Sequence, residues 1–130
     1  MNLRIVKPMG LAGLLGLLPV VALAAPPQGQ WRGIIQQANT DVAVAVSFSA
    51  QVAKVHFADP FSCDVPAKLL KLSDTTTIYR FGVSTNGGRF CDQLAGRDLT
   101  VTPASNGSLT IAFAAPKSSW RGELKQMPTP

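Results

Sequence analysis

The sequence predicts an all-β protein, a single antiparallel up-and-down β-barrel of about eight strands with one disulfide; a β-sandwich is the alternative. Three observations predict this fold. Apolar residues alternate with polar or small ones over most of the chain after residue 24, turn-forming residues separate the alternating runs, and no long segment has helical period. A meander of this length either folds into a sandwich or closes on itself, and closure removes exposed strand edges.

The first element, residues 1–24, is interpreted as a secretory signal peptide. Two basic residues are followed by an apolar run over 9–21, and the Ala-Leu-Ala sequence ending at Ala24 matches the pattern that signal peptidase cleaves. The run is shorter than the roughly 20 residues that a membrane-spanning helix needs. We therefore expect one soluble β-barrel domain over residues 25–130, in the periplasm or outside the cell, with no membrane anchor.

After residue 24 we expect eight or nine short strands, joined by turns rich in Gly, Pro, Asn and Asp. Within 42–49, for instance, Val42, Val44 and Val46 share one face, while alanine and serine share the other. A short helical turn is expected over 92–96. The expected strands span 30–37, 42–49, 53–58, 67–72, 76–83, 88–91, 98–102, 108–114 and 120–126.

The first and last strands carry matching sequences. Residues 31–37 read Trp-Arg-Gly-Ile-Ile-Gln-Gln, and residues 120–126 read Trp-Arg-Gly-Glu-Leu-Lys-Gln. In each strand Trp and Gly fall on one side, where the glycine leaves room for a neighbouring ring or for a bend at a barrel corner. We interpret the two segments as equivalent strands that meet where the barrel closes.

Cys63 and Cys91 are the only cysteines. An exported chain meets an oxidising compartment, so we expect them to form one disulfide. Closing this loop should stabilise the fold by about 3.6 kcal/mol, by restricting the unfolded chain. The long separation is not that of a metal-ligand pair, and a single histidine offers little to activate a thiol.

Composition and charge limit the classes of molecule that the chain is expected to bind. The chain has a formal net charge of +5, and since residues 1–24 hold two of its 12 basic and none of its seven acidic residues, the remainder carries +3. Nucleic-acid binding calls for more positive charge and for exposed aromatic residues among the basic ones. We expect the partner to be another envelope or secreted protein, for example an acidic one, and no nucleic acid.

Residues that could support catalysis are few. His56 lies on the polar face of its expected strand and could pair with Asp59, but no nucleophile has a suitable setting, and one histidine cannot build a zinc site. Asp92 and Asp98 are interpreted as surface charges. We therefore expect no enzyme, no catalytic residue, no metal and no cofactor.

Gly29-Gln30-Trp31 resembles the opening of lipocalin-like (calycin) barrels, in which an arginine from the last strand packs over the indole; Arg121 is the matching arginine. The same opening, together with Cys63-Asp64 and the late strand pair 99–102 and 109–111, is similar to small exported eight-stranded barrels that inhibit bacterial metalloproteases. The resemblance implies a closed barrel that either carries a ligand or inhibits another protein.

The function that these features favour is a non-catalytic binding protein, most of all an inhibitor or immunity-type protein that blocks another protein. Loops 59–65 and 85–89 adjoin the two cysteines, so a disulfide would hold them ready to enter a cleft. The alternative is a carrier of a small apolar or anionic ligand inside a lipocalin-like barrel. The residues expected to contact a partner are Phe61, Arg89, Phe90 and Arg97.

Overall fold

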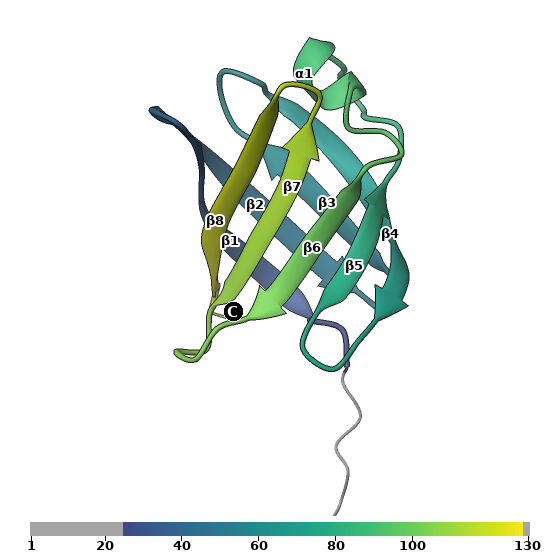
Figure 1. Ribbon diagram of the computed structural model, residues 1–130, viewed down its shortest axis with the longest axis vertical. Helices are drawn as coiled ribbons and strands as arrows, with labels where there is room; N and C mark the ends of the chain where they lie inside the picture. The colour runs from purple at the N-terminus through teal and green to yellow at the C-terminus, as the bar shows by residue number, and fades with distance from the viewer. Residues whose placement is uncertain (1–24, 129–130) are drawn as a thin grey trace, which may run out of the picture.

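The alternating runs form eight antiparallel strands that close into one barrel, in which each strand pairs with its neighbours in the chain and β1 pairs with β8 (Figure 1). A computed structural model describes residues 25–128, and the predicted signal peptide lies outside the described residues. The elements are β1 Gly29–Gln37, β2 Thr40–Ser49, β3 Val52–Phe57, β4 Cys63–Leu72, β5 Thr77–Phe81, α1 Arg89–Asp92, β6 Asp98–Pro103, β7 Leu109–Ala115 and β8 Ser118–Gln126. The predicted barrel is therefore confirmed, and the sandwich is excluded.

One expected strand is wrong. Residues 88–91 do not form a strand, because Gly87 and Gly88 take positive φ angles of 43° and 114° and the chain then enters the single-turn helix α1. The helical turn expected over 92–96 thus starts earlier, and Gly96, with a φ of 83°, lies in the turn that follows α1. In the part of the chain that is described, no helix is long and apolar enough to cross a membrane.

The barrel interior is filled by side chains. The four phenylalanines at its inward positions are all buried, and Ile35, Leu99 and Leu124 of the same core are fully buried. Tyr79 is also fully buried, 5.7 Å from Phe48 between ring centres, and its hydroxyl has no hydrogen-bond partner among the described residues. Burial raises the pKa of Tyr79 to about 12. The buried phenylalanines are Phe48, Phe57, Phe81 and Phe113.

The matching sequences of the first and last strands meet where the barrel closes, at a contact that we call the seam. Gly33 pairs with Leu124 and Ile35 pairs with Gly122, so the two strands are related by an approximate twofold axis. A Cβ atom on Gly33 would overlap the carbonyl oxygen of Glu123 in β8, and one on Gly122 would overlap backbone atoms of β1. The space left by each glycine is thus taken by the backbone of the neighbouring strand, not by a ring.

Antiparallel pairing at the seam places the two tryptophans at opposite ends of the barrel. Trp31 pairs with Gln126, whereas Arg121 pairs with Gln36 and is exposed on the outer face. Arg121 therefore does not cover the Trp31 indole as the lipocalin resemblance implied. The indole Nε1 of Trp31 instead donates a hydrogen bond to the carbonyl oxygen of Gln28, at 2.9 Å.

Candidate functional site

The end of the barrel that carries α1, which we call the upper end, brings together the loops in which the partner-contacting residues were expected. In Figure 1, α1 and the β5–β6 connection cover this end, while the described N-terminal segment leaves from the lower end. The β3–β4 loop at 58–62 also lies there, since β3 runs toward α1 and β4 runs away from it. Phe61, Arg89 and Phe90 thus share one end of the molecule.

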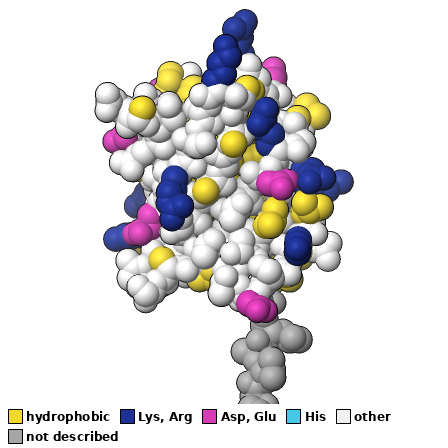
Figure 2. All heavy atoms as spheres, viewed as in Figure 1, with side chains coloured by type: hydrophobic (Ala, Val, Ile, Leu, Met, Phe, Trp, Pro, Cys, Tyr) yellow, Lys and Arg dark blue, Asp and Glu magenta, His cyan; other side chains and the backbone are white. Residues whose placement is uncertain are grey.

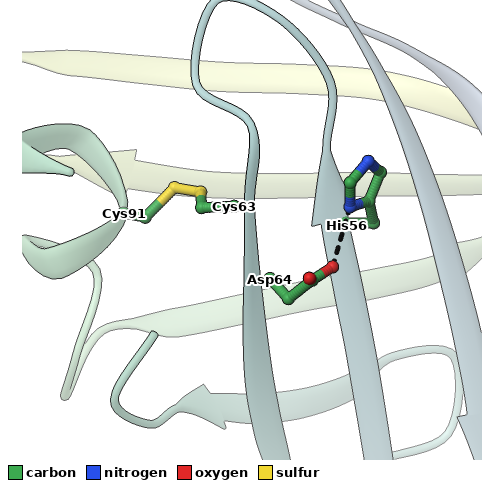
Figure 3. Close-up of polar contacts among 4 residues, drawn as sticks. All are labelled: His56, Cys63, Asp64 and Cys91. Atoms are coloured by element: carbon green, nitrogen blue, oxygen red, sulfur yellow. Dashed lines mark hydrogen bonds and ion pairs between the residues drawn. A yellow bond between two sulfur atoms is a disulfide. The ribbon is translucent and has the colours of Figure 1, made fainter. Parts of the chain in front are cut away.

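A disulfide and a backbone bridge help to fasten the β5–β6 connection to the barrel. Cys63, the first residue of β4, forms the predicted disulfide with Cys91 of α1, and both cysteines are buried (Figure 3). Next to this disulfide, the backbone NH of Thr85 donates to the carbonyl oxygen of Asp64 at 2.7 Å, and the NH of Asp64 donates back to Thr85 at 3.3 Å. The longest connection of the barrel is therefore tied to β4 by a covalent bond and by a backbone bridge.

Phe61 and Phe90 close the upper opening. Their rings stack in parallel, with centres 3.8 Å apart and planes 5° apart. Phe90 also meets Phe57 and Trp120 edge-on, at 5.4 Å and 5.5 Å between ring centres. Both stacked rings are only half-buried, so they pack against the core on one side and contribute to the outer surface on the other.

The two arginines expected to contact a partner differ in their surroundings. Arg89 is exposed and borders a hollow of about 280 Å³ that Lys117 also lines. Arg97 is half-buried, and its Nε donates a hydrogen bond to the carbonyl oxygen of Gln93 at 3.1 Å. Arg97 therefore helps to fix the turn after α1, whereas Arg89 is open to solvent.

His56 pairs with a different carboxylate from the one expected. Its Nδ1 lies 2.7 Å from Oδ1 of Asp64, across the β3–β4 pair, and both side chains are about half exposed (Figure 3). Asp59 instead accepts a hydrogen bond from the Ser62 hydroxyl at 2.5 Å. Among residues 25–128, no three His, Cys, Asp or Glu side chains are grouped as a metal site would require.

Asp92 and Asp98, which were predicted to be surface charges, contact different residues. Asp92 accepts a hydrogen bond from the Ser84 hydroxyl at 2.5 Å, and Asp98 forms a salt bridge with Arg80 at 3.2 Å. On the face viewed in Figure 2, basic and acidic side chains are interspersed, and a basic side chain projects furthest from the upper end. Asp92 and Asp98 therefore do not form a paired carboxylate site.

A groove that sequence reasoning missed lies on the outer wall of the barrel. It has a volume of about 830 Å³ and crosses the outward faces of β8, β1, β2 and β3. Ala43 and Ala45 of β2 lie in it beside Arg32 and Lys125. Small residues on the solvent face of a strand were visible in the sequence, but the neighbours that turn them into a groove depend on strand register.

We compared the chain with known protein families, curated proteins and solved structures, and none of them matches it.

Proposed function

We propose that this protein is a non-catalytic binding protein of the periplasm or the cell exterior, and that it blocks another protein by placing its upper end against it. The observation that supports this proposal most is the disulfide between Cys63 and Cys91, because it joins the two loops that carry Phe61 and Phe90. Loops that are already fixed lose little conformational freedom on binding, and this favours tight association.

The surface chemistry of the upper end favours an acidic partner with an apolar contact. Arg89 and Lys117 are exposed cations, and neither forms a salt bridge with any residue in the described range. The half-buried rings of Phe61 and Phe90 add flat apolar area next to them. Aromatic and basic side chains in this arrangement are common at the centres of protein interfaces.

A carrier function inside the barrel has less support. Fully buried side chains such as Tyr79, Phe57 and Phe81 occupy the interior, and a barrel of eight strands is just wide enough for side chains to fill it.

The proposal is tested by capture with charge-reversal variants of the tagged full chain. Extracts of the envelope and the culture fluid are passed over the wild type, over Arg89→Glu at the upper end, and over Lys71→Glu. Lys71 is exposed in β4 near the lower end, so its reversal is a matched control for charge. We expect the wild type and Lys71→Glu to retain one protein in stoichiometric amount, and Arg89→Glu to lose it.

The retained protein is then assayed for its own activity with and without added barrel. Inhibition by the wild type that Arg89→Glu weakens at least about tenfold would support the proposal. Equal retention by both variants, or retention without inhibition, would overturn it.

A further inference from the structure

The outer groove combines an apolar floor with basic side chains at its rim. Within the groove the outward residues of β2 are Ala43 and Ala45, and Ala45 stands between Arg32 of β1 and His56 of β3. Ile34 of β1 adds an exposed apolar side chain, with 47% of its surface accessible. The floor of the groove is therefore apolar, and the short side chains of β2 form its lowest part.

Two cations face each other across the seam beside this floor. Arg32 of β1 and Lys125 of β8 are directly paired positions on the outer face, and both are exposed. Neither forms a salt bridge with any residue between 25 and 128, although Glu123 also lines the groove. Like charges at directly opposite positions of a sheet destabilise it, so a bound anion would relieve a repulsion that the free protein retains.

A second hollow of the same chain provides a comparison. Lys68 and Arg80 are also a directly paired basic couple on the outer face, beside an exposed Leu70. There, however, Arg80 forms a salt bridge with Asp98 at 3.2 Å. The chain thus supplies its own counter-charge at one basic pair and leaves the other one open.

We propose that the outer groove binds an extended acidic segment of another protein. The groove is open along its length, which suits a polypeptide better than a small molecule that needs enclosure. In an extended segment, alternate side chains point to opposite sides, so apolar side chains can rest on Ala43 and Ala45. The carboxylates then point away from the wall, where the long exposed side chains of Arg32 and Lys125 can extend beside the segment to meet them. A second copy of the chain docked groove to groove would bring its own basic pair to this one, so it is disfavoured.

This inference does not rest on the function proposed for the upper end, because the groove lies on the side wall. The probe is the peptide acetyl-Glu-Leu-Glu-Ala-Glu-Leu-Glu-amide, titrated into the isotopically labelled full chain and followed by NMR. We expect saturable shifts of the backbone amides of Ala43, Ala45 and Arg32. The matching peptide with Gln in place of every Glu should bind about tenfold more weakly.

Two double variants separate a specific site from general attraction. Arg32→Gln with Lys125→Gln should weaken binding of the acidic peptide about fivefold to tenfold, the range expected for two exposed ion pairs. Lys68→Gln with Arg80→Gln removes the same formal charge from the comparison hollow and should leave binding within about twofold of the wild type. Added salt should weaken binding to the wild type more than to the first double variant.

Three results would overturn the proposal. One is equal binding of the acidic and the Gln peptides; another is equal weakening by both double variants. The third is concentration-dependent self-association that Arg32→Gln with Lys125→Gln abolishes in sedimentation experiments, because the groove would then be an interface between copies of this chain. An Ala45→Leu variant, which raises the floor of the groove without changing its charge, should also weaken binding of the acidic peptide. Unchanged binding by this variant would contradict a position of the peptide on β2.

Discussion

The barrel is closed along its side and at its upper end by opposite means. At the seam, β1 and β8 approach so closely that there is no room for a side chain at Gly33 or Gly122. Closure of the wall therefore depends on the absence of side chains at these two positions. At the upper end, closure depends on bulk, because the stacked rings of Phe61 and Phe90 fill the opening and a disulfide holds them there.

The difference indicates which part of the molecule is free to change. The seam joins the first strand to the last, and any added atom there meets backbone that belongs to the barrel wall. The upper end is an addition to a wall that is already complete, since α1 and the β5–β6 connection contribute no strand to the sheet. Side chains at this end can therefore be exchanged for binding while the wall stays intact.

The largest effect is expected at the seam. Gly122→Ala should lower the free energy of unfolding by more than about 4 kcal/mol, because the new methyl group would overlap backbone atoms of Ile34 and Ile35. Gly82→Ala is the control, since its methyl group would lie 3.6 Å from Pro66, and it should change stability by no more than about 1 kcal/mol. Denaturant unfolding measures both; similar small effects would mean that the strands can separate slightly without loss of closure.

The next largest effect is expected for the disulfide. Cys63→Ala with Cys91→Ala should lower the free energy of unfolding by about 3.6 kcal/mol, because the unfolded chain regains the freedom that the cross-link removes. Hydrogen exchange should show that amides of 82–97 lose more protection than those of β1 and β8. A uniform loss around the barrel would contradict the distinction between a complete wall and an added upper end.

Tyr79, the only tyrosine, reports on burial in the barrel interior, apart from the seam and the upper end. Its pKa is about 12 in the folded chain, because burial disfavours tyrosinate, against an ordinary value of 10.0. The unfolded chain therefore releases this proton first, so the stability contribution is complete below pH 10 and falls as the pH rises toward 12, by about 2 kcal/mol. Unfolding at a series of alkaline pH values measures the fall, and tyrosinate absorbance of the native protein locates the pKa.

Tyr79→Phe is the matched variant for this titration. It should abolish the alkaline loss that Tyr79 causes, and near neutral pH it should stabilise the fold by about 1 kcal/mol, because the buried hydroxyl has no partner among the described residues. Destabilisation at neutral pH would indicate that the hydroxyl is satisfied, for example by an internal water.

The smallest effect is expected for the outer ring of the upper end. Phe61→Ala should cost about 1 kcal/mol, because the ring is half-buried and loses its stacked contact with Phe90 and an edge-on contact with Trp120. Phe90→Ala should cost about twice as much, since Phe90 contacts Phe57 and Phe113 as well, which Phe61 does not. Thermal unfolding with calorimetry ranks the two, and the reverse order would place the main closure of the opening on Phe61.

Most of the fold could be predicted because alternation is a local signal. The runs in β2, β3 and β7 specify their buried face residue by residue, and the matching sequences correctly predicted which strands meet. The strand expected over 67–72 begins earlier, at Cys63, and β4 thus includes Pro66, a residue that cannot donate to a ladder. The carbonyl oxygen of Pro66 accepts from the NH of Gly82 at 2.8 Å, beyond the end of β5. Because the NH and the carbonyl of a strand residue face the same neighbour, the NH that proline lacks would lie outside the β4–β5 ladder.

The candidate sites were harder to predict because they depend on distant neighbours. The sequence placed Phe61, Arg89 and Phe90 near the cysteines, but not the ring stack that leaves Arg89 as the most open of them. Residues 88–91 contain no alternation long enough to distinguish a strand from a helical turn, and the positive φ angles of two glycines decide the outcome. The outer groove requires the register of four strands, which no local pattern specifies.

Closure at the seam also determines how the chain can be rearranged. β1 begins and β8 ends at the lower end, where the NH of Met127 donates to the carbonyl oxygen of Gln30 at 2.8 Å. A short linker could therefore join these two points, and new termini could be opened in the β4–β5 turn without separating any strand pair, which makes the barrel a candidate for circular permutation. Fusion at Gly29 or Gln126 would attach a second protein to the end opposite α1, so that the upper end would face outward from any surface that carries it.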